Sequence, residues 1–298
     1  MRTIASPRAG TIRRFIVWMM LLGLGAYKLD PAVSIDDLEN GGGTIAPHTP
    51  MDHLLRATAR AESRHFWFRG FRSFVNPLVR AAVAGRPGAR LLDCGCGTGA
   101  NLGLLAQYGR AYGFDLSEVG VAFARTAGRR TVARATVTAV PFPSITFDLV
   151  TSFDVLYSLG EADERTAVAE MFRVLKPGGF AIINVAAMPA LTGDHSVLSR
   201  EQRRYTRESL RTLLELGGFT IERLTYTNAT LFLPLAIVRG FHRWRGLSSE
   251  AEAQQEIAVP WAPVNAALTA LLWLESAWLR VVDNPFGSSL LCLARKPD

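Results

Sequence analysis

Short apolar runs alternate with amphipathic stretches along most of this chain of 298 residues. The apolar runs have the length and bounding turns of buried strands, and the stretches between them repeat apolar residues at helical spacing. We expect strands near residues 90–94, 111–115, 131–136, 147–153, 179–185, 219–226 and 288–295, and helices near residues 52–62, 70–83, 100–108, 117–127, 161–175 and 206–216. This alternation predicts an α/β fold with a parallel sheet that helices cover on both faces.

The pattern changes between the last two predicted strands, where about 60 residues replace a short hairpin connection. We predict that residues 229–285 form an apolar helical insertion, built on Leu231–Val238 and on Val264–Val282, which carries Trp273 and Trp278. Prolines and polar residues interrupt both segments, so neither is expected to span a bilayer. Two alternatives stay open. The helices form a lid for a lipid-like acceptor or lie in a membrane interface, or they pack on the sheet or form the face of a homodimer.

The first 50 residues differ from the rest of the chain. An apolar run from Phe15 to Ala26 follows four arginines, and Gly41-Gly42-Gly43 comes later, so residues 1–50 are predicted to be an extension or linker. The apolar run is too short for a confident spanning helix. The alternatives are an interfacial anchor or disordered extension, a natural start at Met51, and a signal peptide. Residues 51–298 are predicted to form the functional domain.

Composition narrows the setting of the protein. Hydrophobic residues make up 49% of the chain and the mean hydropathy is +0.15, both high for a soluble protein. Three cysteines, two of them in one glycine-rich turn, argue against a disulfide framework and favour a reduced, cytoplasmic compartment. Cys94 and Cys96 have no companion cluster of His or Cys, so we expect no bound metal.

The net charge of +7 is concentrated near residues 2–14 and 239–245, beside apolar stretches. The chain has no long run of Lys and Arg with interleaved aromatic residues, so nucleic acid is not expected as a partner. The basic clusters suit an anionic membrane surface or a phosphate-bearing substrate, which predicts a cytoplasmic protein with membrane association. The alternative is a set of ordinary solvated arginines.

The segment Leu91-Leu92-Asp93-Cys94-Gly95-Cys96-Gly97-Thr98-Gly99 is the most informative about function. It predicts a buried strand that runs into a glycine-rich turn, where backbone N–H groups approach a ligand closely. The carboxylate of Asp93 would repel the phosphates of a dinucleotide, but it suits the cationic amino-acid end of S-adenosylmethionine (SAM). Asp115, at the end of the next strand, could accept both hydroxyls of a ribose, in NAD as well as in SAM. Alternatively, Asp115 caps the helix that follows.

Four blocks of sequence together resemble class I SAM-dependent methyltransferases of the type-11 domain group. The blocks are Leu92–Gly99, Gly113–Ser117, Val140–Pro143 with Phe147–Val150, and Arg173–Gly179. The resemblance implies a Rossmann-like, seven-stranded class I methyltransferase sheet with an antiparallel last strand. It also implies that SAM is the cofactor, that Asp93 and the glycine loop hold its methionine portion, and that Asp115 holds its ribose. The predicted cofactor contacts are Asp93, Cys94, Gly95, Gly97, Gly99, Asn101, Asp115, Leu116, Thr136, Val137, Phe153 and Asp154.

A narrower bacterial group is similar over His65-Phe66-Trp67-Phe68-Arg69-Gly70 and over Arg203-Arg204-Tyr205-Thr206. The chain departs from these relatives at Thr136, where many have an acid that accepts from the adenine amino group. It departs again at Tyr157-Ser158, where many have a Glu-His pair. These departures put the catalytic details in doubt, but not the fold.

Methyl transfer is an in-line displacement at the sulfonium, so the enzyme chiefly positions the nucleophile and excludes water. We expect an O, N or C nucleophile on a small-molecule or lipid-linked acceptor, and for an O or N nucleophile we look for a base. The predicted catalytic residues are His195, Asp194 and Tyr157, and the predicted acceptor-binding residues are His65, Trp67, Arg203, Arg204 and Tyr205. Each has a structural alternative, such as packing, a solvated loop position, or an ion pair of Arg204 with Glu201 or Glu208. For the whole protein, an NAD-dependent oxidoreductase of Rossmann type and a non-catalytic SAM-fold binding protein are the alternatives.

Overall fold

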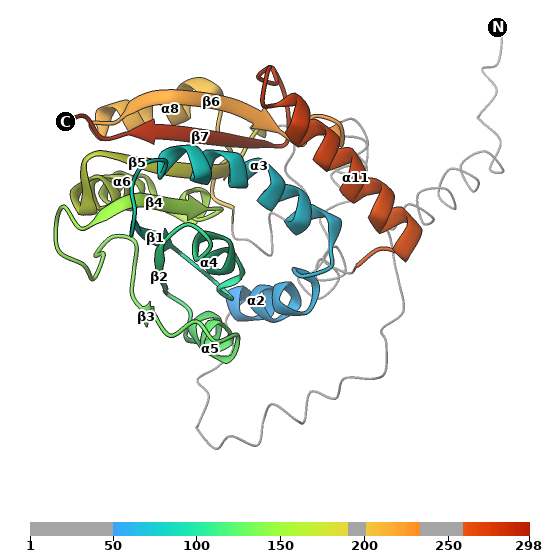
Figure 1. Ribbon diagram of the computed structural model, residues 1–298, viewed down its shortest axis with the longest axis horizontal. Coiled ribbons are helices and arrows are strands. Elements are labelled where there is room, and N and C mark those ends of the chain that lie inside the picture. The colour runs from blue at the N-terminus through green and yellow to red at the C-terminus, as the bar shows by residue number, and fades with distance from the viewer. Residues whose placement is uncertain (1–49, 190–200, 233–258) are drawn as a thin grey trace, which may run out of the picture.

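A computed structural model describes residues 50–189, 201–232 and 259–298 (Figure 1). Within these residues, seven strands form one sheet in the order β3-β2-β1-β4-β5-β7-β6. The strands are β1 (Arg90–Cys94), β2 (Arg110–Asp115), β3 (Val132–Arg134), β4 (Phe147–Phe153), β5 (Leu175–Ala186), β6 (Thr220–Thr227) and β7 (Ser289–Arg295). The helices are α2 (Pro50–Ala61), α3 (Phe66–Ala82), α4 (Ala100–Leu105), α5 (Glu118–Thr126), η2 (Leu156–Ser158), α6 (Glu161–Val174), α8 (Arg207–Leu216) and α11 (Ala262–Trp278). The predicted seven-stranded α/β sheet is confirmed.

The first five strands run parallel, and β7 lies between β5 and β6 and is antiparallel to both. The predicted antiparallel last strand is therefore confirmed. β1 has β2 on one side and β4 on the other, so the direction of the chain across the sheet reverses at β1. In open α/β sheets, ligands bind at such a reversal, beyond the carboxyl ends of the strands. The glycine loop follows β1 at this point.

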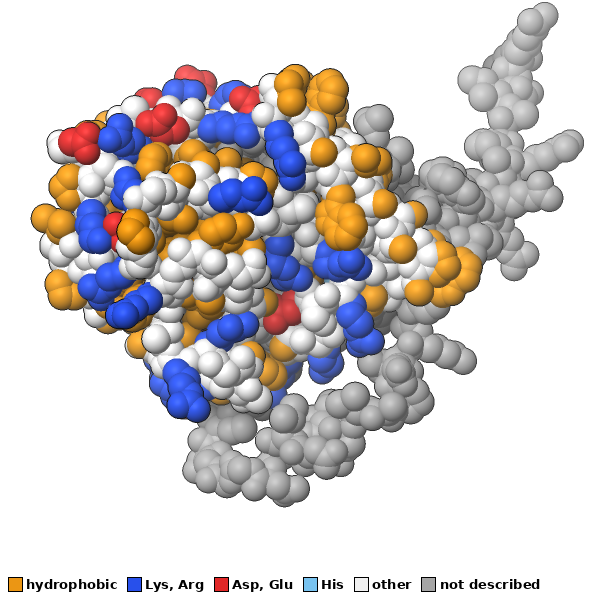
Figure 2. All heavy atoms as spheres, viewed as in Figure 1, with side chains coloured by type: hydrophobic (Ala, Val, Ile, Leu, Met, Phe, Trp, Pro, Cys, Tyr) orange, Lys and Arg blue, Asp and Glu red, His pale blue; other side chains and the backbone are white. Residues whose placement is uncertain are grey.

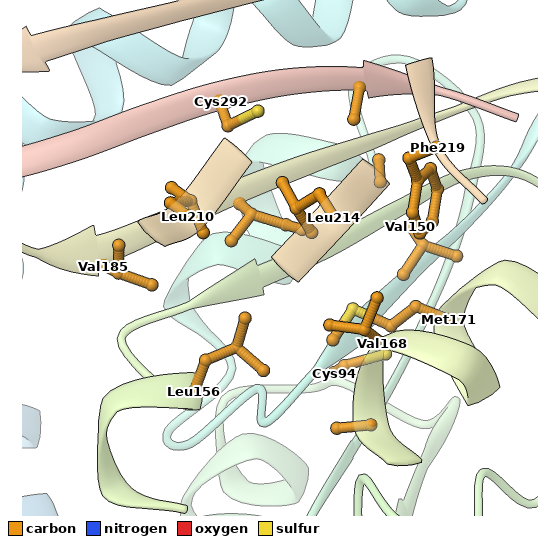
Figure 3. Close-up of a cluster of buried hydrophobic side chains, with 14 of the residues drawn as sticks. Cys94, Val150, Leu156, Val168, Met171, Val185, Leu210, Leu214, Phe219 and Cys292 are labelled. Atoms are coloured by element: carbon orange, nitrogen blue, oxygen red, sulfur yellow. The ribbon is translucent and has the colours of Figure 1, made fainter. Parts of the chain in front are cut away.

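Helices cover both faces of the sheet. Successive residues of a strand point to opposite faces, so each strand contributes side chains to both cores. In β1, Leu91 belongs to the core beneath α3, α4 and α11, whereas Leu92 belongs to the core beneath α6 and α8. Both side chains are fully buried. Figure 3 shows the second core, to which α6 contributes Met171 and α8 contributes Leu210 and Leu214. The predicted covering of both faces is confirmed.

The predicted starts of α3 and β5 lie well inside the observed elements, for local reasons. Helix α3 begins at Phe66 rather than at residue 70, because the side chain of His65 caps it. Strand β5 begins at Leu175 rather than at residue 179, because Leu175 already pairs with Phe147 ahead of a register shift. Both extensions depend on contacts that the apolar pattern does not encode.

Helix α11 is the longest described part of the insertion predicted between the last two strands, and it packs against α3. The two helices approach closely at Gly70, where an added Cβ would lie 2.3 Å from Cδ1 of Leu272. Most of the predicted apolar segment Leu231–Val238 lies outside the described residues, as do residues 1–49, so the boundary near residue 51 stays a prediction. No helix within the described ranges is long and apolar enough to cross a membrane.

Candidate functional site

The glycine loop between β1 and α4 follows a path that glycine adopts readily and other residues do not. Gly95 and Gly99 each have a φ of 79°, in the left-handed region that side chains disfavour. A Cβ on Gly95 would lie 2.4 Å from Cγ2 of Val155, so the loop also passes close to the end of β4. The N–H groups of Gly95 and Cys96 both donate to the carbonyl of Phe114 at 2.9 Å. These bonds fix the loop to β2.

Asp115 ends β2 and braces the same loop. Its Oδ2 accepts from the N–H of Gly97 at 2.8 Å, and its Oδ1 accepts from the N–H of Ser117 at 2.8 Å. The N-cap of α5 is Ser117, whose hydroxyl accepts from the N–H of Gly120. Because a carboxylate has about four lone-pair sites, Asp115 can hold the loop and still accept from ligand hydroxyls. The structural and the binding interpretations of Asp115 are therefore compatible.

Asp93 lies directly before the loop and is only 1% exposed. Its Oδ1 accepts from the hydroxyl of Thr151 on β4 at 2.6 Å, whereas its Oδ2 is buried and has no hydrogen-bond partner among the described residues. Burial raises the pKa of Asp93 to about 7, the bond from Thr151 opposes this shift, and the charge of Asp115 adds to it. A buried polar atom without a partner is costly. Oδ2 of Asp93 is thus suited to a cationic or hydrogen-bond-donating ligand.

Helix α2 covers the loop, a contact that the hydrophobic pattern does not predict. The hydroxyl of Thr98 donates to Oε2 of Glu62, just beyond the end of α2, at 2.6 Å. A Cβ on Gly97 would lie 3.2 Å from Cδ2 of Leu55. Burial raises the pKa of Glu62, while the bond from Thr98 lowers it. The amphipathic pattern of residues 52–62 predicts the helix but does not predict that the helix packs on the glycine loop.

At the carboxyl end of β4, Phe153 and Asp154 reach the same edge of the sheet. Phe153 is buried and meets Phe71 of α3 edge to face, with ring centroids 5.0 Å apart. Asp154 has a φ of 61°, its N–H donates to the carbonyl of Asn184 at 3.0 Å, and its Oδ1 accepts from Nδ2 of Asn184 at 2.9 Å. Desolvation by the surrounding protein raises the pKa of Asp154, although solvent reaches the residue. Asn184 thus orients the carboxyl group of Asp154, whose backbone adopts a left-handed conformation that is uncommon for residues other than glycine.

The other predicted cofactor residues differ in accessibility. Cys94 is wholly buried in the core beneath α6 and α8, and Val137 is buried in the same core. Asn101 lies in the first turn of α4, and the side chain of Leu116 is 67% exposed directly after Asp115. Oγ1 of Thr136 lies 2.9 Å from Oγ1 of Thr138. Leu116 and Asn101 are therefore better placed for ligand contact than Cys94.

His65 and Trp67, predicted to bind the acceptor, lie at the start of α3. Nδ1 of His65 accepts from the N–H of Trp67 at 3.2 Å, and the imidazole stacks on Phe66 with centroids 4.5 Å apart. His65 is buried and Trp67 is partly buried. The structure gives His65 a capping role, and acceptor binding by either residue stays a prediction.

Arg203 and Tyr205 meet at Glu164 of α6. Nη1 of Arg203 donates to Oε2 of Glu164 at 2.6 Å, and the hydroxyl of Tyr205 donates to Oε1. Burial, together with Glu164, raises the pKa of Tyr205. A cleft of about 500 Å³ opens here between α6 and α8, but its lining includes no residue of the glycine loop, β2 or β4. We place the candidate site at the glycine loop, where the buried carboxylate oxygen is unpaired.

Arg204 forms an ion pair with Glu201, which was one structural alternative to acceptor binding by this arginine. The pair has a distance of 2.8 Å and both side chains are 4% exposed, and Arg204 also donates to the carbonyl of Ala187 at 3.0 Å. Its Nε is buried and has no hydrogen-bond partner in the part of the chain that the structure describes. Tyr157 is buried in the core, and its carbonyl accepts from the N–H of Gln202 at 2.9 Å. These contacts join the arginine segment to the end of β5 and to η2.

His195 and Asp194, predicted to be catalytic, lie outside the described residues. Within the described residues, no group of three or more His, Cys, Asp or Glu side chains could hold a metal ion. The carboxyl edge thus brings together the glycine loop, Asp93, Asp115 and Asp154. Arg203 and Tyr205 lie in a different cluster, around Glu164.

Comparisons with known proteins agree with this geometry. The family model of the methyltransferase domain matches residues 92–183. A Mycolicibacterium smegmatis protein named as a probable S-adenosylmethionine-dependent methyltransferase is 28% identical over 243 residues, which cover 78% of this chain and 90% of that protein. An uncharacterized methyltransferase of Synechocystis sp. is 30% identical over 157 residues, 49% of this chain and 73% of that protein. A solved SAM-dependent methyltransferase of Thermotoga maritima is 18% identical, with a TM-score of 0.51 over 83% of this chain and 100% of that chain.

Proposed function

The chain belongs to the methyltransferase-domain family of SAM-dependent methyltransferases, with SAM as its cofactor, and we propose that it methylates an O, N or C nucleophile of a small-molecule or lipid-linked acceptor. The main support for the site is the unpaired, buried Oδ2 of Asp93. The ammonium group of the methionine portion would supply the charge and the donor that this oxygen lacks. The pyrophosphate of a dinucleotide would instead bring negative charge to it, so the oxidoreductase alternative has no support.

The glycine loop and the end of β2 suit the remainder of the cofactor. Glycine at positions 95, 97 and 99 lets the loop follow its positive-φ path at the carboxyl edge of the sheet, because a Cβ there would contact Val155, Leu55 and Ala124. Asp115 would accept from the ribose hydroxyls while it holds Gly97. The exposed side chain of Leu116 would give the adenine an apolar contact. The side chain of Cys94, by contrast, is buried in the core, so it would support the glycine loop by packing and would not contact SAM.

The chemistry at the acceptor requires positioning and, for O or N nucleophiles, a site for the departing proton. When bound, SAM supplies a methyl group on a sulfonium, which is the electrophile. Asp154 lies at the carboxyl end of β4, is reached by solvent and is oriented by Asn184 at 2.9 Å. We assign Asp154 the role of proton acceptor from this placement, and a raised pKa, caused mainly by desolvation, would suit a general base. Asn184 is its positioning residue.

The cellular setting is also part of the proposal. Cys94, Cys96 and Cys292 are free and buried, which suits a reducing, cytoplasmic compartment. Arg203 and Arg204 already face Glu164 and Glu201, so an anionic acceptor would have to compete with these carboxylates. This competition favours an acceptor that is held mainly by apolar contact.

Calorimetric titration with SAM, its demethylated product and NADH tests the cofactor site. We expect micromolar binding of the first two and no binding of NADH. The substitution Asp93→Asn should weaken SAM binding about 10- to 100-fold, since a hydrogen bond to a charged group contributes about 1.5–3 kcal/mol. Glu118→Gln, a change at an exposed carboxylate near the same loop, is the matched control.

Transfer itself is tested by incubating labelled SAM with lipid and sugar extracts. Label in an extracted molecule, reduced in Asp154→Asn without loss of SAM affinity, would support both the reaction and the proton acceptor. Tight SAM binding without transfer to any extract would favour the non-catalytic alternative. Binding of NADH alone would overturn the assignment of the site.

A further inference from the structure

Helix α11 buries polar side chains together with Leu272 and exposes its two tryptophans and Leu274. Its polar residues Asn265, Thr269, Glu275 and Ser276 are between 2% and 8% exposed. Large apolar side chains on and around it face solvent: Trp261, Trp273, Leu274, Trp278, Val281, Val282 and Phe286. A surface helix of a globular protein normally shows the opposite arrangement. We call these seven side chains the outer face of α11.

Hydrogen bonds fix this orientation. Oδ1 of Asn265 accepts from the N–H of Phe66 at 2.8 Å, and the hydroxyl of Ser276 donates to the carbonyl of Ser73 at 2.7 Å. Both partners belong to α3, so the helix is attached near both of its ends. Rotation of α11 to bury the apolar side chains would leave these buried polar groups unpaired, at a cost of about 1–3 kcal/mol each.

Glu275 attaches the helix a third time. Its carboxylate accepts from the N–H of Ala229 at 2.8 Å and from the hydroxyl of Thr230 at 2.6 Å, both just after β6, and from Nδ2 of Asn284 at 3.0 Å. The one acidic residue of α11 is thereby 4% exposed and withdrawn from the outer face. The exposure of the apolar side chains is built into the fold.

Cations border the outer face. The guanidinium of Arg69 lies 5.3 Å from the ring centroid of Trp273, and Arg280 is exposed two residues beyond the end of the helix. The acid beside it, Asp283, is paired with Arg223 at 2.7 Å. Figure 2 shows hydrophobic side chains over α11 with Lys and Arg side chains next to them. A surface of this kind complements a partner that is apolar within and negatively charged at its boundary.

We propose that the outer face of α11 docks on an anionic lipid bilayer, with the helix lying in the plane of the headgroups. Tryptophan is enriched at this depth of a bilayer, because its ring is apolar and its N–H is polar. Neighbouring arginines keep their charge among the anionic headgroups while their stems remain apolar. Three of the six tryptophans of the chain lie on this one face.

A second copy of the chain is a less suitable occupant. In a two-fold dimer the same surface meets itself, so the arginines bordering one outer face would approach those bordering the other. Within the described residues, the neighbouring acids Glu275 and Asp283 are already bonded inside the same chain. A bilayer with anionic headgroups supplies the missing negative charge and the apolar layer together.

Docking would also act on the proposed site. The N-terminal part of α11 contacts the junction of α2 and α3, where Nδ2 of Asn265 donates to the carbonyl of Arg64 at 2.8 Å. At the same junction, the carboxylate of Glu62 accepts from the hydroxyl of Thr98 and so holds the glycine loop. Docking of the outer face would thus bring the cofactor site to lipid-linked acceptors. This role of the docking rests on the proposed function. The docking itself can be tested without any methyl transfer.

Co-sedimentation with vesicles of phosphatidylcholine alone, or of phosphatidylcholine and phosphatidylglycerol, tests the docking of the full chain. We expect binding to the anionic vesicles only. The double variant Trp273→Ser with Trp278→Ser should weaken this partition about tenfold per tryptophan, or roughly 100-fold, since each indole loses apolar burial in the bilayer. Leu216→Ser removes an 81% exposed apolar side chain of α8 and should leave the partition unchanged.

Four results would overturn the docking proposal. They are the absence of pelleting with anionic vesicles, equal pelleting with neutral vesicles, unchanged pelleting of the double variant, and a dimer in sedimentation velocity that the double variant converts to a monomer. Circular dichroism and urea titration of every variant check that the fold is retained, and each chain is also titrated with SAM. The SAM titration separates the two proposals, because a chain that binds vesicles but not SAM fails only the proposed function.

Discussion

Two polar clusters lie toward the carboxyl edge of the sheet, and they differ in how completely their charges are paired. Beside the glycine loop, Asp93 has a buried oxygen with no partner. In the arginine segment, Arg203 faces Glu164 at 2.6 Å and Arg204 faces Glu201 at 2.8 Å. Oδ2 of Asp93 lacks a cation, whereas the carboxylates of Glu164 and Glu201 each face an arginine.

This difference shows why residue type alone is a weak guide to a site. Arginines in a basic chain resemble an anion site in sequence, yet an ion pair already formed inside the fold has little to offer a ligand. A buried carboxylate next to a loop of glycines is the opposite case, because the fold leaves part of its hydrogen-bonding capacity unused. We therefore expect changes in the arginine cluster to affect stability, and changes in the glycine-loop cluster to affect ligand affinity.

The largest effect is expected from Arg204→Met. The substitution removes the guanidinium that faces the buried carboxylate of Glu201 at 2.8 Å, which should lower the free energy of unfolding by about 3–5 kcal/mol in urea titration. Adding Glu201→Leu should restore much of this loss, because no charge then remains buried. Arg211→Met, at a pair whose side chains are about half exposed, should change stability by less than about 1 kcal/mol. A stable Arg204→Met protein with impaired acceptor turnover would instead assign Arg204 to the acceptor.

A slightly smaller effect, and one of a different kind, is expected from Asp115→Ala. The variant loses the bond to the N–H of Gly97 and the proposed bonds to the ribose. Together these should weaken SAM binding by about 3 kcal/mol, or roughly 100-fold, with a smaller change in the free energy of unfolding. Calorimetry and urea titration on the same samples measure the two quantities. A loss of stability without a loss of affinity would place Asp115 with the structural cluster.

The third effect is a pH dependence with opposite signs for affinity and stability. The ammonium of SAM favours ionised Asp93, whose pKa without ligand is about 7. Affinity should therefore fall by up to about tenfold for each pH unit below 7. Because the folded-state pKa is raised, Asp93 stabilises the unliganded fold below the unfolded-state pKa of about 4, and this contribution disappears as the pH rises to 7. Titrations and melting curves between pH 5 and 8 should show both trends, and Asp93→Asn should flatten both.

The sequence predicts short-range features of the fold better than it predicts the contacts that build the site. The order of strands and the position of Asp93 before the glycines follow from short-range patterns, and the bounds of β4 match the predicted 147–153. The bond between Thr98 and Glu62 joins residues 36 apart, and that between Asp154 and Asn184 joins residues 30 apart. No local period encodes such contacts. The pattern likewise identifies α11 as apolar but not which of its faces is exposed.

The smallest effect is expected at His65, which separates capping from acceptor binding. Nδ1 of His65 accepts from the N–H of Trp67 at the start of α3, so His65→Ala should lower the free energy of unfolding by about 1 kcal/mol. His65→Asn supplies another side-chain acceptor that is favoured at helix N-caps and should recover most of this loss. Neither variant should change the dissociation constant of SAM. If His65 contacts the acceptor instead, both variants should raise KM for the acceptor similarly, because asparagine replaces the cap but not the imidazole. Urea titration and acceptor kinetics on the two variants therefore decide whether this histidine belongs with the paired groups of the fold or with the groups left open to a ligand.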